Sequence, residues 1–167
     1  MRLTRYTDFA MRVLLYLGRQ PERLSPIAEI AGAYAISKNH LMKVVNDLVN
    51  AGYLESVRGR HGGIRLARPP EEINVGALIR HTEDSFDLVD CGSCLIAPAC
   101  GLTSVLDEAL QAFLRVLDGY SLADVLARRG DFSHLLRTVA DPVGASTTMP
   151  RQERSECVSP QYDSRKV

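Results

Sequence analysis

The chain has 167 residues, of which 46% are hydrophobic and 24% are charged, the ordinary composition of a globular protein with a sizeable core. No apolar run reaches the roughly 18 residues of a membrane span, and the charged N-terminus lacks the pattern of a signal peptide, so we expect a cytoplasmic protein without a membrane partner. The net charge of zero conceals a basic first half, because residues 1–68 hold eleven Lys and Arg against five Asp and Glu, which favours binding of a polyanion.

Three helices are predicted in residues 1–50. Apolar residues are dense from Thr7 to Gly18, which predicts a mostly buried helix with Asp8 in its first turn. Ser25 followed by proline is typical of a helix start, so we expect Ser25 to be the N-cap of a short second helix. The third helix is predicted from Ser37, its N-cap, to about Asn50, because apolar residues recur there with helical spacing.

A β-hairpin is predicted directly after these helices. Two short segments, Tyr53–Val57 and Ile64–Arg68, have the composition of strands and flank a basic loop rich in glycine. Three helices followed by such a hairpin are the arrangement of a winged helix-turn-helix. The sequence therefore predicts a mainly α fold with a small β-hairpin.

This arrangement suggests how the chain would bind double-stranded DNA. Helix-turn-helix proteins place the second helix of the pair in the major groove, and here that helix is Ser37–Asn50. Asn side chains can pair with adenine and Lys with guanine, while a glycine-rich basic wing lets the backbone approach DNA closely. The alternative is an ordinary solvated helix face and turn. The expected DNA-binding residues are Ser37, Lys38, Asn39, His40, Lys43, Arg58, Arg60, His61, Gly62 and Gly63.

The second half contains one long helix between two shorter ones. Asn74 is expected to cap a helix that ends near Glu83, and another short helix is expected from Ser121 to Arg129. Between them, Gly101–Asp118 carries an apolar stripe that the short helices cannot cover. Pairing with the same helix of a second copy is the leading explanation, with a core helix in a monomer as the alternative. The predicted domains are 1–70, a winged helix-turn-helix; 71–140, a cysteine loop and dimerisation helix; and 141–167, a disordered tail.

Three cysteines, Cys91, Cys94 and Cys100, lie within ten residues between these regions. In a reducing compartment, clustered thiols indicate metal or redox chemistry more than a disulfide framework. Three thiolates can share one metal centre. We interpret Cys157 in the tail as a bystander, so a fourth ligand has to come from elsewhere in the chain or from a second chain. A structural zinc site and a switch by Cys91–Cys94 disulfide formation are alternatives. An enzyme is not expected, because the chain lacks catalytic-triad, phosphate-loop and paired-carboxylate patterns.

Several segments, in order, resemble NsrR-type repressors, which sense nitric oxide through an iron–sulfur cluster and belong to a winged-helix family that also includes IscR. The resemblance covers roughly residues 1–140. The segments that carry it are Asn39–Leu48, Ala51–Leu54, Arg58–Leu66, Cys94–Leu102 and Phe113–Asp124.

The resemblance implies a dimeric transcriptional repressor that binds a palindromic operator and releases it when nitric oxide attacks its iron–sulfur cluster. The implied ligands are Cys91, Cys94 and Cys100 with Asp8 of the partner subunit, and the implied cofactor is a [4Fe-4S] cluster, with [2Fe-2S] as the alternative. IscR-like proteins carry a histidine three residues after the last cysteine. Thr103 stands there in this chain, so an IscR-like or thiol-based redox-sensing regulator is the second choice. The chain departs from its relatives in leaving only two residues between the first two cysteines.

Overall fold

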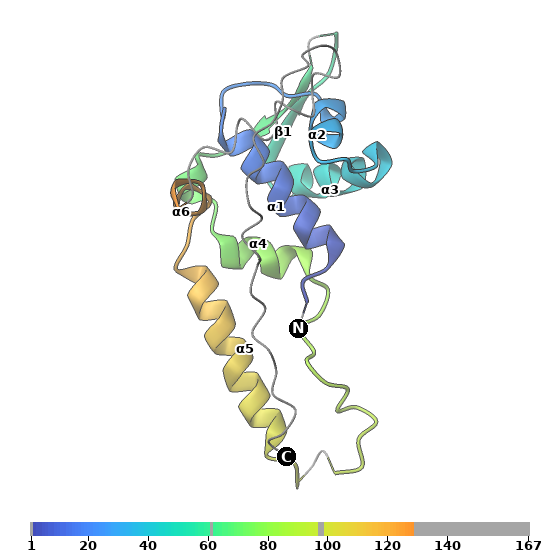
Figure 1. Ribbon diagram of the computed structural model, residues 1–167, viewed down its shortest axis with the longest axis vertical. Coiled ribbons are helices and arrows are strands. Elements are labelled where there is room, and N and C mark those ends of the chain that lie inside the picture. Colours follow the sequence, from blue (N-terminus) through green and yellow to red (C-terminus); the bar gives the residue numbers. More distant parts are fainter. Residues whose placement is uncertain (1, 61, 97–98, 129–167) are drawn as a thin grey trace, which may run out of the picture.

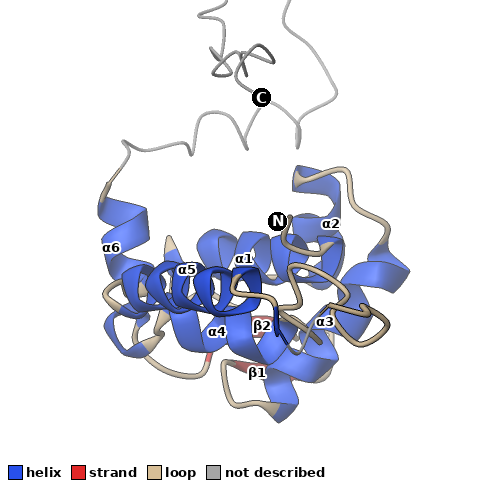
Figure 2. Ribbon diagram, turned by 90° about the horizontal axis from the view of Figure 1, so that it is seen from below, coloured by secondary structure: helices blue, strands red, loops and turns tan. Residues whose placement is uncertain are grey.

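A computed structural model of the protein describes residues 2–60, 62–96 and 99–128. Within these residues the elements are α1 (Arg5–Gly18), α2 (Ile27–Ala33), α3 (Lys38–Asn50), β1 (Leu54–Val57), β2 (Gly63–Leu66), the 3-10 helix η1 (Pro70–Glu72), α4 (Val75–Thr82), α5 (Leu102–Asp118) and α6 (Leu122–Ala127). The first three helices and the hairpin form an upper lobe, α4 crosses beneath it, and α5 extends away from it (Figure 1). Seen from below, the described chain is helical apart from loops and two short strands (Figure 2). The predicted fold class, mainly α with a small β-hairpin, is confirmed.

One hydrophobic core holds the upper lobe together. It draws on α1, α2, α3, the hairpin, α4 and α6, and α1 supplies Val13 and Leu14 with no exposed surface at all. Ile73, Leu78 and Leu122 belong to the same cluster of buried residues. Residues on both sides of the predicted boundary at residue 70 therefore share this core, and the division into two regions stays a prediction.

Two helix starts differ from the sequence prediction. Helix α1 begins two residues early, because the side chain of Thr4 caps it by accepting a backbone hydrogen bond from the first turn. Ser25 is not the N-cap of α2, a position that Pro26 occupies. Instead, the backbone of Ser25 exchanges two 2.9 Å hydrogen bonds with Ile64 and lies beside the hairpin like a third strand. The prediction for Ser25 was wrong because this long-range pairing uses the residue that local sequence assigned to a cap.

The hairpin follows α3 through a tight turn. Gly52 has a φ of +73°, a left-handed conformation that favours glycine and ends the helix. The two strands pair antiparallel in a register that sets Leu54 opposite Leu66 and Val57 opposite Gly63. A Cβ at Gly63 would lie 2.8 Å from the carbonyl oxygen of Ser25, so glycine permits the close approach of the extra backbone segment.

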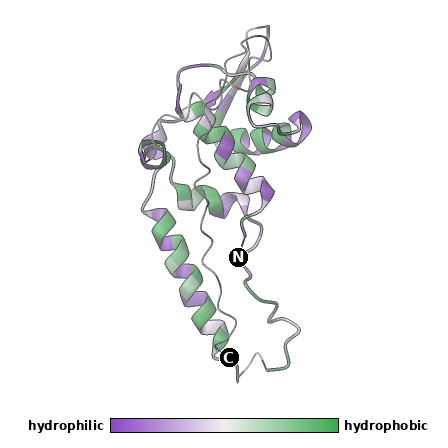
Figure 3. Cartoon of the chain, in the orientation of Figure 1, coloured by the Kyte–Doolittle hydropathy of each residue, from purple (hydrophilic) through white to green (hydrophobic). Residues whose placement is uncertain are grey.

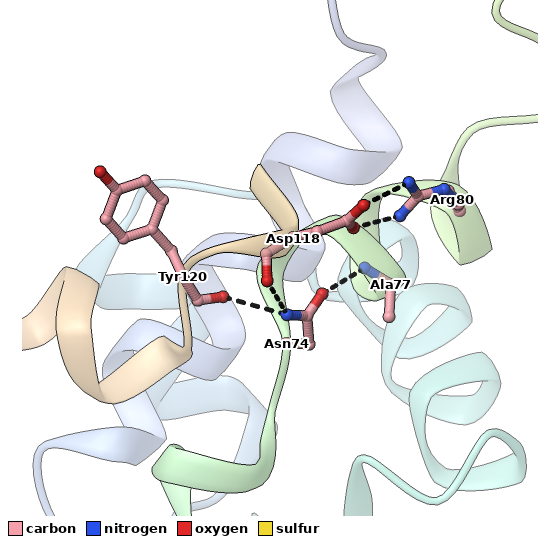
Figure 4. A network of polar contacts seen from close by, with 5 residues as sticks. All are labelled: Asn74, Ala77, Arg80, Asp118 and Tyr120. Atoms are coloured by element: carbon pink, nitrogen blue, oxygen red, sulfur yellow. Dashed lines mark hydrogen bonds and ion pairs between the residues drawn. The ribbon is translucent and has the colours of Figure 1, made fainter. Parts of the chain in front are cut away.

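Helix α5 is attached to the rest of the chain at its C-terminal end. Asn74 caps α4 by accepting a 2.9 Å hydrogen bond from the backbone N–H of Ala77, and its Nδ2 donates to the carbonyl of Asp118 at 2.7 Å (Figure 4). The guanidinium of Arg80 forms a two-point ion pair with the Asp118 carboxylate. A Cβ on Gly76 would fall 2.0 Å from Oδ1 of Asp118, so glycine is required for this contact. No helix in the described ranges is long and apolar enough to cross a membrane.

Candidate functional site

The outer face of α3 carries the first group of predicted DNA-binding residues. Ser37, Lys38, Asn39, His40 and Lys43 are all exposed. The apolar stripe of the same helix is buried and fixes which face points outward; its members are Leu41, Val44, Val45 and Leu48. The structure therefore brings these five polar side chains together on the first turns of one rigid element. Such an element holds contacting side chains in place better than a loop would.

Two further residues on the outer face of α3 were not predicted as DNA contacts. Met42 is 41% exposed, although its side chain is apolar, and Asn46 is exposed as well. They stand three and seven residues after Asn39, and this spacing places them on its side of the helix. Helical spacing counted from Asn39 was the signal that could have found them.

The tip of the hairpin carries the second group. Arg58 and Arg60 are exposed, and the loop closes through a 3.0 Å hydrogen bond from the Gly62 N–H to the carbonyl of Gly59. Gly59 has a φ of +121°, and a Cβ on Gly62 would lie 2.2 Å from the carbonyl oxygen of Val57. Both glycines are thus required by the turn itself. His61, the other predicted contact of this loop, lies outside the described residues.

The three clustered cysteines lie on the long loop between α4 and α5. This loop runs beside α5 to the end that is farthest from the upper lobe (Figure 1). Cys94 is exposed, Cys91 and Cys100 are half-buried, and all three are free thiols. The sulfur of Cys91 lies 3.7 Å from the hydroxyl of Thr103 on the first turn of α5.

The cysteines share a loop but do not converge on a point. In the part of the chain that the structure describes, no group of three or more His, Cys, Asp and Glu side chains could hold a metal ion. The donor set itself fits a thiolate-bound centre, because three free and at least partly accessible thiols occupy one short loop. A closed site would require the loop to gather around the centre and a further ligand to complete it.

Asp8, the predicted ligand from a second chain, lies in the first turn of α1. Its exposed carboxylate pairs with Arg12 one turn later, with Oδ2 2.9 Å from Nη2 and Oδ1 3.0 Å from Nε. The part of the loop that carries the cysteines lies toward the far end of α5 (Figure 1), and the described chain does not group Asp8 with its own cysteines. A role for Asp8 at such a centre is therefore a proposal about two chains.

The apolar stripe of α5 is largely uncovered. Of this helix, which is described throughout, Leu114 is the one buried residue. Leu102, Val105 and Val116 are 56%, 59% and 61% exposed. Figure 3 shows apolar residues recurring along the whole length of α5. The sequence prediction of an apolar face wider than its neighbours can cover agrees with this exposure.

Comparisons with known proteins point to one family. Residues 3–128 match the Rrf2 family, which is described as an iron-dependent transcriptional regulator. The HTH-type transcriptional regulator NsrR of Bacillus subtilis (strain 168) is 50% identical over 143 residues, which cover 82% of this chain and 98% of the relative. The protein of the same name from Geobacillus kaustophilus (strain HTA426) is 49% identical over 143 residues, with 82% and 97% covered.

Solved structures of similar fold include two named regulators. IscR from T. potens matches with a TM-score of 0.63 and 26% identity, covering 78% of this chain and 93% of that one. The oxidized form of CymR from Staphylococcus aureus matches with a TM-score of 0.66 and 24% identity, covering 78% and 100%. At that identity, the likeness to CymR concerns the fold alone.

Proposed function

This chain belongs to the Rrf2 family of transcriptional regulators, and from that premise we propose that it is a nitric-oxide-sensing repressor with an iron–sulfur centre. That it is a DNA-binding transcriptional regulator and not an enzyme follows from its relatives. The observation that carries the proposal further is the set of three free cysteines within ten residues, on the loop between α4 and α5. The proposal places the protein in the cytoplasm, where DNA is present and thiols stay reduced.

The upper lobe would bind the operator through α3 and the hairpin tip. Asn39 is exposed on the first turn of α3, where helix-turn-helix proteins contact base edges, and Lys43 is exposed one turn later. Arg58 and Arg60 at the hairpin tip would contact the phosphate backbone or the adjacent groove. Phosphate contacts would fix the register of the lobe, and α3 would supply the sequence preference.

The cysteine loop would hold the centre. Cys91, Cys94 and Cys100 are the thiolate ligands in this proposal, and Asp8 of the partner subunit supplies an oxygen ligand. When bound, a [4Fe-4S] cluster, or alternatively a [2Fe-2S] cluster, supplies iron that reacts with nitric oxide. Thr103 stands where IscR-like proteins carry a histidine. It lies beside the sulfur of Cys91 and would line the site without serving as a ligand.

The chain's own residues explain why such a centre would affect DNA binding. Asp8 lies on α1, and α1 shares its hydrophobic core with α3. A bond from Asp8 to the partner's cysteine loop would therefore restrain the lobe that carries α3. Loss of that restraint would let the two copies of α3 leave the spacing of a palindromic operator, roughly 34–36 Å between half-sites. Two copies would associate through the exposed apolar face of α5.

Reconstitution without oxygen tests the centre. We expect the full chain to take up iron and sulfide and to show visible absorbance that Cys94→Ala loses. We also expect the reconstituted protein to bind DNA fragments selected by the protein itself from a random pool, and to release them when nitric oxide is added. Colourless protein that contains zinc, or metal-free protein that responds to peroxide instead, would refute the proposal.

Asp8→Ala tests the cross-subunit ligand separately. We expect an altered cluster spectrum and a weaker response to nitric oxide in this variant. Arg12→Ala is the matched control, because it removes the ion-pair partner of Asp8 but keeps the carboxylate. An unchanged spectrum and response in Asp8→Ala would remove Asp8 from the site and leave the cysteine ligands in place.

A further inference from the structure

Three consecutive residues at the end of α4, here called the α4 junction (His81, Thr82 and Glu83), each bond to the upper lobe. Nε2 of His81 lies 3.0 Å from Oδ2 of Asp47 on α3. The hydroxyl of buried Thr82 accepts a 2.9 Å hydrogen bond from the hydroxyl of Thr7 on α1. A single turn of helix thus contacts both the element that carries the DNA-binding residues and the element that carries Asp8.

Glu83 completes the junction at the N-terminus of α1. Its Oε1 accepts hydrogen bonds from the backbone N–H of Thr4 at 2.8 Å and from the Thr4 hydroxyl at 3.1 Å. Thr4 is the N-cap of α1, so Glu83 holds the helix start in place. Burial raises the pKa of Glu83, but the neighbouring hydroxyl of Thr7 and the hydrogen bonds from Thr4 outweigh it and keep the pKa below its ordinary value.

Asp47 on α3 interacts with side chains of two other helices. Besides its contact with His81, its carboxylate acts on Tyr6 of α1, whose pKa rises to about 12 because of its burial first and the Asp47 carboxylate second. The ring of His81 also lies against that of Tyr53, with centroids 5.9 Å apart. The C-terminal half of α3 is therefore held to α4 by the His81–Asp47 contact, in addition to the packing of its apolar stripe.

The cysteine loop begins at this junction. Glu83 is the C-cap of α4, and the chain from there to Cys91 contains no helix or strand. On the N-terminal side of the cysteines, Glu83 and the last turn of α4 are therefore the first structured residues that a change in the loop would reach. We infer that the α4 junction couples the cysteine loop to α3 of its own subunit, with His81 as a positioning residue for α3 and Glu83 for α1. This inference rests on the proposed function, and it adds a path inside one subunit to the bond proposed between subunits.

DNA affinity in two states of the full chain tests the coupling. The quantity is the ratio of Kd for a protein-selected duplex between metal-free protein and protein reconstituted with iron and sulfide. We expect His81→Ala and Asp47→Asn to lower this ratio by roughly two- to thirtyfold, the usual range for residues that carry coupling. The side chain of His81→Gln can still donate a hydrogen bond to Asp47, so this variant should keep most of the wild-type Kd ratio. Arg23→Gln breaks an exposed ion pair with Glu29 away from the junction and should leave the ratio unchanged.

Amide hydrogen exchange of α3 supplies a readout that does not depend on DNA. Reconstitution should slow exchange in α3 of the wild-type protein, and His81→Ala should reduce that difference while its thermal unfolding midpoint stays close to wild type. A wild-type ratio above one that persists unchanged in His81→Ala and Asp47→Asn would overturn the coupling and leave the proposed function standing. A wild-type ratio of one would overturn both.

Discussion

The carboxylate of Glu83 makes the stability of the protein depend on pH in a defined direction. Because Glu83 has a lower pKa in the folded chain than in the unfolded chain, its contribution is fully present above the unfolded pKa and is lost as pH falls through the folded pKa. We expect Glu83→Gln to lower the thermal unfolding midpoint at neutral pH. The gap to wild type should close below the ordinary glutamate pKa of about 4.3.

Thermal melts of both proteins between pH 7 and pH 3 check this expectation. Asp118 and Asp124 also have lowered pKa values, because of the Arg80 side chain and the Ser121 backbone respectively. They titrate alike in both proteins, so the difference between the two melting curves isolates Glu83. A gap that stays constant over the whole range would show that the Glu83 charge does not matter for stability.

Two residues on α3 should affect DNA binding in different ways. Asn39→Ala should cost about 1–3 kcal/mol of discrimination at one base pair, because a side-chain amide reads an adenine edge. Lys43→Ala should weaken binding to all duplexes and lower the slope of log affinity against log salt by about one, because its ammonium would contact a phosphate. Fluorescence anisotropy at several salt concentrations separates the two effects. Asn50→Ala, at the far end of the helix, is the control and should change neither quantity.

Between elements, Asn74 both caps α4 and holds α5. Asn74→Ala loses the cap and the hydrogen bond to Asp118 together, and we expect a loss of about 1–2 kcal/mol in the free energy of unfolding. Asn74→Asp keeps the acceptor for the Ala77 N–H but cannot donate to Asp118. Urea denaturation of the two variants should therefore place the aspartate variant between alanine and wild type. Equal losses would show that the cap contributes nothing.

Local signals predicted the helix ends where short-range chemistry decides them. Asn74 and Ser121 cap their helices as expected, and Ser121 forms a capping box with Asp124. Ser25 was mispredicted because its backbone pairs with Ile64, which is 39 positions away in the chain. Spacing along a sequence carries no information about such a partner. The α4 junction escaped prediction for the same reason, since it joins residues from α1, α3 and α4.

At the scale of the whole molecule, some features of the candidate centre could be predicted from the sequence and others could not. The sequence predicted which residue types could bind a metal and that one loop carries them. It could not predict that the described part of a single chain brings no three such side chains together at one point, because this depends on how the loop between α4 and α5 folds. Likewise, the apolar stripe of α5 could be read from the sequence, but how much of it stays exposed required the structure.

The exposed face of α5 makes the assembly of the protein testable. Leu102, Val105, Ala109 and Val116 recur at spacings of three, four and seven residues, so they share one face of the helix. A charge within that face would have to be buried unpaired in a dimer, which is strongly unfavourable. We therefore expect Val105→Lys to sediment as a monomer. Because two linked lobes bind far more tightly than one, its affinity for a two-half-site duplex should fall by about a hundredfold or more.

Gln111→Lys adds the same charge on the far side of α5, about 150° around the helix from the centre of that face, and serves as the matched control. It should remain dimeric and keep its affinity. Binding to a duplex with a single half-site provides a second check, because a folded Val105→Lys monomer should bind it as well as wild type does. If Val105→Lys sediments as a dimer, or if the wild type is a monomer at the concentrations where it binds DNA, the α5 face is not the interface. The proposed ligand from the partner subunit would then have no structural basis.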